Sequence, residues 1–161
     1  MELYGESDNH TLDERGRVFV PNRFKPFFEM GGFLTRAFNG QCLVFYPGSS
    51  LESFKQRLQT VKDKLAAVDA TQFLKATRAA DDLTRFVSCG VPITLDGQGR
   101  LAIPPTLRRR ATLETTVTFV ALGDRLEIWD EQRWLAYDDT QLNPDALDQT
   151  LSEVYGAVQA A

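Results

Sequence analysis

An aspartate followed four residues later by an arginine occurs twice in this chain, as Asp13/Arg17 and as Asp96/Arg100. A guanidinium group is planar and can fork onto a phosphate or onto the edge of a guanine, and a carboxylate can hold it in the required orientation. The alternative role is an ion pair within the chain that fixes a turn, although an exposed pair contributes only about 0–1 kcal/mol. The two roles are compatible, and we favour contact with nucleic acid for both arginines.

Each pair lies inside a longer repeated segment. Residues 11–21 read Thr-Leu-Asp-Glu-Arg-Gly-Arg-Val-Phe-Val-Pro, and residues 94–104 read Thr-Leu-Asp-Gly-Gln-Gly-Arg-Leu-Ala-Ile-Pro. Six residue types coincide at an offset of 83 positions. The offset persists without a gap in the pairs Thr35/Thr118, Gly40/Gly123, Leu43/Leu126 and Tyr46/Trp129. We therefore expect an internal duplication of one small unit, with a pseudo-two-fold axis.

Turn chemistry explains the aspartate and the glycine of the repeat, but not the arginine. Asp at the first position of a type I turn accepts a backbone hydrogen bond, and Gly at the fourth can take a positive φ, which predicts a hairpin with a glycine bulge at Gly16 and at Gly99. Alternation along the following strand turns apolar residues inward and the arginine outward. The expected inward residues are Val18, Val20, Leu101 and Ile103, and the expected outward residues are Arg17, Phe19, Arg100 and Ala102.

Other cations lie close to the repeated segments. Arg15 lies within the first turn, and the candidates for phosphate contacts are Arg23, Lys25, Arg108, Arg109 and Arg110. A run of three arginines is also typical of a solvated helix end, which the helix dipole favours. Beside a basic turn the same run suits contacts with phosphates.

The charge of the 161 residues is unevenly distributed. The net charge is −4, yet residues 1–123 hold 16 Lys/Arg against 13 Asp/Glu, a net charge of +3. Residues 124–161 hold 2 Arg against 9 Asp/Glu, a net charge of −7, which is typical of a solvated acidic helix. The acidic total therefore does not exclude an anion-binding face on the remaining, mildly basic part.

Hydrophobic patterning predicts a similar order of elements in both halves. For the first half the expected strands are 11–12, 17–20, 32–37 and 41–46, with a short helix at 22–28 and a hairpin signal at Asn39-Gly40. Two amphipathic helices should follow and pack as a helical hairpin, one carrying Leu51, Phe54, Leu58, Val61 and Leu65, the other from about Asp69 to Phe86 with Phe73 among its apolar residues. For the second half we expect a hairpin at 96–100, a helical turn at 104–110, strands at 116–122 and 125–129, and helices at 131–137 and from Asn143 onward.

Other kinds of site find no support in the residues. Cys42 and Cys89 lack metal-ligand spacing and are expected to be reduced thiols, and His10 has no ligand cluster near it. Without a phosphate-binding glycine motif or a catalytic triad, we expect no enzymatic activity, no metal, no cofactor and no small-molecule substrate. No apolar run approaches the ~20 residues of a membrane span, and no basic-then-apolar leader is present, so we expect a cytoplasmic protein without membrane contact.

The repeated segment also resembles a known family. The pattern Leu-Asp-x-x-Gly-Arg followed by apolar-x-apolar-Pro is similar to the signature of the swapped-hairpin barrel of bacterial transition-state regulators and many antitoxins. Two copies with a helical insert between them resemble the MraZ family of transcriptional regulators. Further matches are residues 42–47, which end the first half, and residues 125–130 followed by Trp134, which end the second. The resemblance covers residues 4 to 137.

What the resemblance implies is specific. It implies DNA contact by Asp13/Arg17 and Asp96/Arg100, assembly into a ring, and binding to short direct repeats upstream of the cell-division and cell-wall gene cluster, including the regulator's own gene. With Arg15, these residues form the expected site for double-stranded DNA.

The sequence as a whole predicts an α+β protein, a duplicated swapped-hairpin (AbrB/SpoVT-like) β-barrel with pseudo-two-fold symmetry and a helical linker. We expect DNA-binding units at 7–53 and 90–133, a helical linker at 54–89 and an acidic helical tail at 134–161. The expected function is sequence-specific regulation of transcription, as a repressor, by a nucleoid-associated homo-oligomeric ring on promoter direct repeats. The alternative is a ring-forming protein-interaction adaptor with only weak non-specific DNA binding. A steep salt dependence of DNA binding would favour the regulator.

Overall fold

A computed structural model of the chain describes residues 2–65, 67 and 70–161. The strands are β1 (Leu3–Thr11), β2 (Arg17–Phe19), β3 (Gly32–Arg36), β4 (Leu43–Pro47), β5 (Val91–Ile93), β6 (Arg100–Ala102), β7 (Thr116–Gly123) and β8 (Leu126–Asp130). The helices are the 3-10 helix η1 (Asn22–Phe28) and the α-helices α1 (Leu51–Leu65), α2 (Ala70–Ser88), α3 (Pro105–Arg110), α4 (Glu131–Gln141) and α5 (Pro144–Ala160). The predicted α+β class is confirmed.

Six strands form one antiparallel sheet in the order β1-β7-β8-β4-β3-β5, and β2 pairs with β6 in a separate two-stranded ribbon. If each strand is replaced by its counterpart from the other half of the chain, the strand order in both sheets stays the same. In the centre of the sheet Val44 lies opposite Glu127, and in the ribbon Val18 lies opposite Leu101, each pair being 83 residues apart. The repeat in the sequence is thus a repeat in the strand pairing.

The sequence predicted that the two strands flanking each aspartate turn pair with each other as a local hairpin, and this prediction is wrong. Between those strands only the hydrogen bond that closes the turn is formed. The N–H of Asp13 donates to the carbonyl of Arg17 at 2.9 Å, but β1 then pairs with β7 and β2 pairs with β6. The reason is burial: pairing across the halves places Val18 and Leu101 opposite each other with almost no exposed surface. The first strand is also longer than predicted, because β1 follows the edge of β7 from Leu3 onward.

The predicted barrel also differs from the observed strand arrangement. The described strands lie in two separate sheets, and they do not close into a barrel. One face of the six-stranded sheet packs against β2, β6, η1 and α3 around a core that includes Phe24, Leu34, Phe45, Leu107 and Ile128. On the other face, α4 covers β7 and β8 through Trp129, Trp134 and Tyr137.

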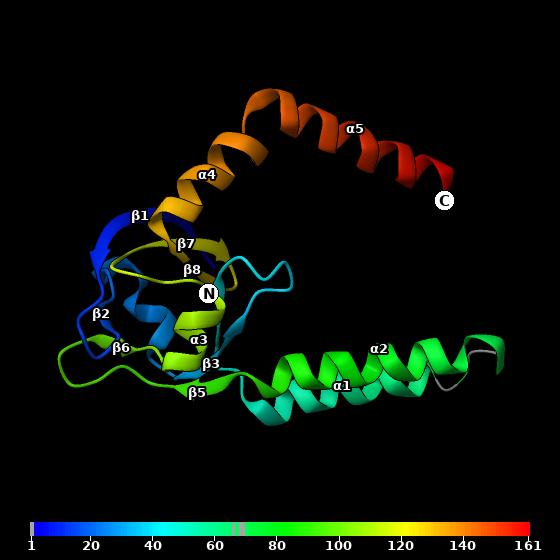
Figure 1. The fold of residues 1–161 in the computed structure, drawn as a ribbon, viewed down its shortest axis with the longest axis horizontal. Helices are drawn as coiled ribbons and strands as arrows, with labels where there is room; N and C mark the ends of the chain where they lie inside the picture. Colours follow the sequence, from blue (N-terminus) through cyan, green and yellow to red (C-terminus); the bar gives the residue numbers. More distant parts are fainter. Residues whose placement is uncertain (1, 66, 68–69) are drawn as a thin grey trace.

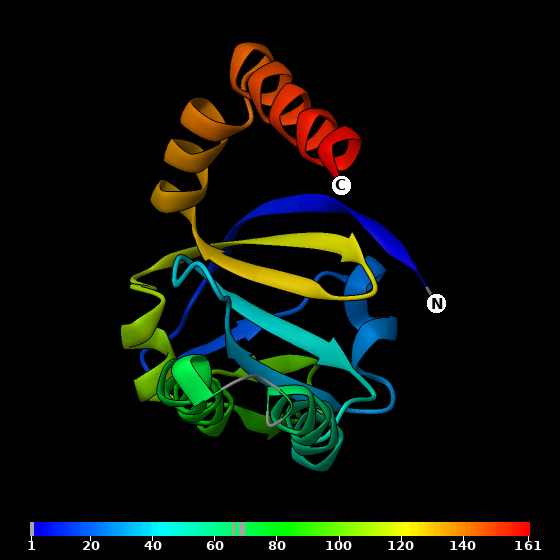
Figure 2. The ribbon, with the colours of Figure 1, turned by 90° about the vertical axis from the view of Figure 1, so that its right-hand side faces the viewer.

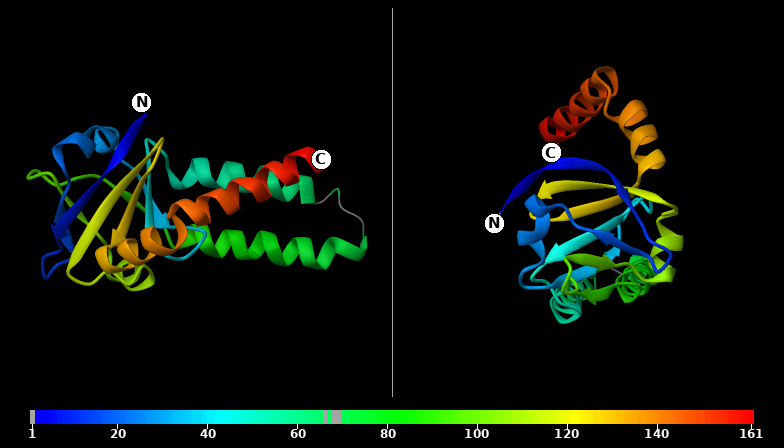
Figure 3. Two further views of the ribbon diagram at one scale, coloured as in Figure 1. Left: turned by 90° about the horizontal axis from the view of Figure 1, so that it is seen from above. Right: turned by 90° about the vertical axis from the view of Figure 1, so that its left-hand side faces the viewer.

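The long helices extend from this body in two pairs. Helices α1 and α2 form the predicted helical hairpin and project far to one side (Figure 1). The view along that hairpin shows α4 and α5 on the opposite side of the sheet (Figure 2). Seen from above, the axis of α5 is roughly aligned with the axes of α1 and α2 (Figure 3). None of the helices in the described part of the chain has both the length and the apolar character that a membrane span requires.

Most element boundaries match the prediction within a few residues. The hairpin at Asn39-Gly40 is confirmed, with β3 and β4 paired from Gly32 and Pro47 to Arg36 and Leu43. Helix α1 is anchored by the ring of Phe54, whose centroid lies 4.8 Å from that of Phe33. The side chains of Leu51, Leu65 and Phe73, and the helix start expected at Asp69, lie outside the described residues.

Candidate nucleic-acid interface

The first aspartate turn is built by the carboxylate of Asp13. Its Oδ1 accepts the backbone N–H groups of Arg15 and Arg17, each at 2.9 Å, and its Oδ2 accepts Nε of Arg17 at 2.7 Å. Gly16 has a φ of +74°, a conformation that side-chain-bearing residues adopt only with strain. The turn therefore fixes the position of Nε of Arg17, and it leaves the two Nη groups of the guanidinium to other acceptors.

The second turn repeats this geometry almost atom for atom. Oδ1 of Asp96 accepts the N–H groups of Gln98 and Arg100, each at 2.9 Å, and Oδ2 accepts Nε of Arg100 at 2.8 Å. Gly99 has a φ of +75°. Both ion pairs that the sequence left open as an alternative are thus present, and they hold both arginines in the same way.

The hydrogen bonds of each turn favour the charged form of its aspartate. The backbone N–H of Arg17 contributes most to lowering the pKa of Asp13, and the Arg17 side chain and the N–H of Arg15 lower it further. The backbone N–H of Arg100 is likewise the largest cause of the lowered pKa of Asp96. Both carboxylates are consequently charged at neutral pH.

Each turn receives a cation from the other half of the chain. The side chain of Arg108 lies against Gly16, where a Cβ would come within 2.5 Å of its Cζ, and Lys25 lies against Gly99, where a Cβ would come within 3.0 Å of its Nζ. Lys25 and Arg108 are themselves 83 residues apart, so this is one arrangement made twice. Glycine is needed at both turns for its positive φ and for this close approach.

Backbone hydrogen bonds also join the two turns. The carbonyl of Gly16 accepts the N–H of Ile103 at 2.9 Å, and the carbonyl of Gly99 accepts the N–H of Val20 at 3.2 Å. The two Asp–Arg pairs therefore belong to one structure rather than to two independent loops. Figure 1 places the β2–β6 ribbon and its turns at the end of the molecule away from α1 and α2.

The ribbon buries one face and exposes the other, as alternation predicted. Val18 and Leu101 face the core, whereas Phe19 is 59% exposed on the outer face. The guanidinium of Arg100 lies 5.9 Å from the ring of Phe19 on the neighbouring strand, within the range of a cation–π contact. The outer face thus holds the exposed Phe19 and Ala102 together with Arg17 and Arg100, whose side chains are 28% and 20% exposed.

The other predicted cations are placed less uniformly. Arg15 is exposed on the first turn, and Arg109 and Arg110 are exposed in the last turn of α3. Arg23 donates to the carbonyl of Glu6 and lies 4.5 Å above the ring of Phe24, so it is held against β1 rather than at a turn. Of the predicted phosphate contacts, the structure brings Lys25 and Arg108 to the turns.

Sequence reasoning missed that each turn is completed by the opposite half. The signal was present, because Lys25 and Arg108 occupy equivalent positions and are both cationic. Nothing in the sequence stated which turn each would approach, since that depends on the cross-half pairing of β2 with β6.

His10 and the cysteines show no geometry of a reactive site. His10 shares a hydrogen bond of 2.8 Å with Ser7, and burial lowers its pKa. Cys42 is buried and Cys89 half-buried, and both are free thiols. In the residues that the structure describes, no three His, Cys, Asp or Glu side chains gather closely enough to hold a metal ion.

Comparison with known proteins gives a consistent result. The family described as "MraZ protein, putative antitoxin-like" matches residues 90–153. The Transcriptional regulator MraZ of Lactiplantibacillus plantarum is 31% identical over 150 residues, which is 92% of this chain and 97% of that protein.

The chain belongs to the MraZ family.

Other members of the MraZ family match over a similar extent. The Transcriptional regulator MraZ of Alkaliphilus metalliredigens is 33% identical over 148 residues, covering 91% of this chain and 94% of the relative. That of Limosilactobacillus reuteri is 33% identical over 152 residues, covering 93% and 97%. These relatives are named as regulators and not as enzymes, in agreement with the function class expected from the sequence.

Proposed function

We propose that this chain is a sequence-specific DNA-binding regulator of transcription. The observation that carries the proposal is the exposed face of the β2–β6 ribbon, where two arginines are each oriented by an aspartate. The names of the relatives support the same function.

The ribbon has a suitable form for the major groove of DNA. That groove is about 12 Å wide and admits a two-stranded β-ribbon. A bidentate contact with O6 and N7 of guanine uses two guanidinium donors, and the Nη groups of Arg17 and Arg100 remain after Nε is bound by aspartate. Asp13, Arg15, Arg17, Asp96 and Arg100 are thus our candidates for direct DNA contact.

Phosphate contacts would come from the cations beside the turns. Lys25 and Arg108 lie at the turn glycines, while Arg109 and Arg110 are exposed on the neighbouring helix α3. Arg23 is the weakest candidate, because it is bound to the backbone of Glu6. Since each turn holds only a few cations, one chain should bind a single site weakly, and strong binding should require several linked chains.

We propose assembly into a ring on short direct repeats, with repression of the cell-division and cell-wall gene cluster and of the regulator's own gene. The support is the family resemblance together with the low charge of a single site. A ring of identical contacts presents its ribbons in one sense, which suits direct repeats better than a palindrome. Such a regulator would act in the cytoplasm, associated with the nucleoid.

We also propose that the fold is an opened form of the duplicated swapped-hairpin (AbrB/SpoVT-like) arrangement with a pseudo-two-fold axis. The cross-half pairing of β2 with β6, of β1 with β7 and of β3 with β5 supports this proposal. The proposal includes the division of the chain into DNA-binding units at 7–53 and 90–133, a helical linker at 54–89 and an acidic helical tail at 134–161.

The rival function is a protein-interaction adaptor with weak, non-specific DNA binding. Helix α5 favours it, because Leu147, Leu151, Val154, Tyr155 and Val158 are exposed along this helix. An apolar helix face of this kind is typical of a surface for protein contact.

Selection and sequencing of the genomic fragments that the protein binds would test the regulator proposal. We expect a few fragments, each with repeated short boxes in one direction, and an affinity that falls steeply with salt. Light scattering should give a mass of several chains, and probes with three boxes should bind more tightly than probes with one. Fragments without a shared sequence would contradict the proposal and favour the adaptor.

A further inference from the structure

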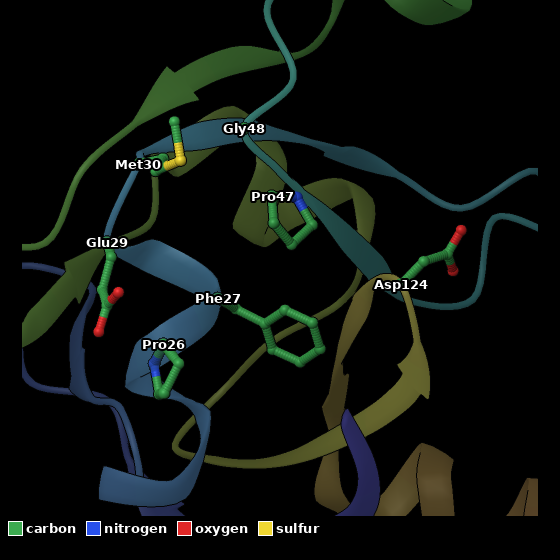
Figure 4. A pocket seen from close by; sticks show the side chains of 7 residues that line it. All are labelled: Pro26, Phe27, Glu29, Met30, Pro47, Gly48 and Asp124. Atoms are coloured by element: carbon green, nitrogen blue, oxygen red, sulfur yellow. The ribbon is translucent and has the colours of Figure 1, made fainter. Parts of the chain in front are cut away.

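A hollow of about 290 Å³ lies between η1, the end of β4 and the turn from β7 to β8. Its apolar lining comes from Pro26, Phe27 and Pro47. Figure 4 shows Phe27 in the middle, with the carboxylates of Glu29 and Asp124 on opposite sides. This geometry suits a ligand that has an apolar stem and a cationic end.

The two acidic residues at the hollow have counterparts near an arginine side chain of the same chain. At the offset of 83, Glu29 corresponds to Thr112 and Asp124 corresponds to Gln41. There Nη1 of Arg133 donates to Oγ1 of Thr112 at 3.0 Å, and the same residue lines a depression with Gln41. An arginine side chain thus binds the counterpart of Glu29 and lines the same depression as the counterpart of Asp124.

The first half has no arginine at the corresponding position, and its helix also begins later. Helix α4 starts at Glu131, directly after β8, so Arg133 lies in its first turn. After β4 the chain continues through residues 48–50, and α1 starts only at Leu51. The position equivalent to Arg133 is Ser50, which carries no cation.

The residues at the hollow differ in charge from their counterparts in the other half. Thr112 and Gln41 are neutral, whereas Glu29 and Asp124 are acidic. Asp124 has an exposed ion pair of 2.9 Å with Arg125, and Glu29 has no ion pair with any residue that the structure describes. Carboxylates favour a guanidinium more strongly than the neutral hydroxyl of Thr112, which already accepts one.

We propose that this hollow binds an arginine side chain of a partner protein. The guanidinium would bind the carboxylates of Glu29 and Asp124, and its aliphatic stem would pack on Phe27 and Pro47. None of the residues that line the hollow belongs to β2 or β6.

The methionine methyl groups allow a direct test. The chain has two methionines, and Met30 lies at the hollow with 87% of its surface exposed. In protein with ¹³C-labelled methionine methyls, addition of N-acetyl-arginine-N-methylamide should shift the Met30 signal and leave that of Met1 unchanged. The neutral citrulline analogue should produce no shift. An unmoved Met30 signal, or equal shifts with both compounds, would overturn the proposal.

Two double variants test whether the carboxylates of the hollow bind the arginine probe. Glu29→Gln/Asp124→Asn should weaken the arginine probe about tenfold or more, because a hydrogen bond to a charged group contributes about 1.5–3 kcal/mol. Glu52→Gln/Asp82→Asn removes the same charge from α1 and α2 and should bind as the parent does, and thermal melts would verify that both variants are folded. Equal binding by all three proteins would contradict the assignment.

The mass from light scattering should not change in Glu29→Gln/Asp124→Asn, and a lower mass would assign the hollow to another copy of this chain instead of a partner.

Discussion

The side chain of Arg108 lies against Gly16, although the two residues belong to different halves of the chain. The equivalent contact of Lys25 with Gly99 completes the second turn. Each candidate DNA-contacting turn therefore combines an Asp–Arg pair from one half with a cation from the other. A single half would lack this combination, which gives a physical reason for the duplication within one chain.

Substitution of the turn glycines should lower both the stability of the fold and the affinity for DNA. Gly16→Ala and Gly99→Ala should each lower the free energy of unfolding by about 1–2 kcal/mol, since a Cβ is strained at a positive φ. The new Cβ should also displace Arg108 or Lys25 and so weaken DNA binding. Urea denaturation and anisotropy titrations would measure the two effects.

Gly40→Ala is the matched control for these variants. Gly40 has a φ of +70° but no atom within 4 Å of an added Cβ, so it has the backbone strain without the contact. It should lose similar stability and keep its affinity for DNA. An equal loss of affinity in Gly40→Ala would show that strain alone explains the effect.

The stability of the fold should decrease in acid. The pKa values of Asp13 and Asp96 are lowered in the folded chain, so their contribution is present above the ordinary aspartate pKa of about 3.9 and is lost as the pH falls through the folded values. Asp13→Asn/Asp96→Asn should therefore lose less stability than the parent between neutral pH and acid. Thermal melts at a series of pH values would measure this, with Asp138→Asn/Asp139→Asn as a control that removes two charges from α4. A parallel pH dependence in the parent and in Asp13→Asn/Asp96→Asn would contradict the role of these carboxylates.

The two thiols should differ strongly in reactivity. Cys42 is buried, and burial with the nearby carboxylate of Glu127 raises the pKa of its thiol far above the ordinary value. Cys89 is half-buried, so a disulfide reagent at pH 8 should modify one thiol in the native protein and a second only after unfolding. In Cys89→Ser no fast reaction should remain. Two equally fast thiols in the native protein would contradict the burial of Cys42.

Much of the local structure could be predicted from the sequence, because local rules determine it. Asn39-Gly40 predicted the β3–β4 hairpin, and the spacing of Phe54, Leu58 and Val61 predicted α1. The pairing of β2 with β6 could not be predicted from local turn chemistry, because it depends on burying Val18 against Leu101. The same applies to the site: spacing within the repeat predicted the two Asp–Arg pairs, but only the cross-half packing brings Lys25 and Arg108 to them.

The measurement that tests the central claim most directly compares arginine with lysine at the two turns. Arg17→Lys/Arg100→Lys keeps the charge but removes the planar fork, so the affinity for the selected box should fall by about 1–3 kcal/mol per site. Affinity for a scrambled duplex, which depends on phosphate contacts, should change little. Arg78→Lys/Arg85→Lys on α2 makes the same exchange away from the ribbon and should bind both duplexes as the parent does. Anisotropy titrations at one salt concentration would show a loss confined to the box in Arg17→Lys/Arg100→Lys if the account is right. Unchanged affinity for the box in that variant would contradict it.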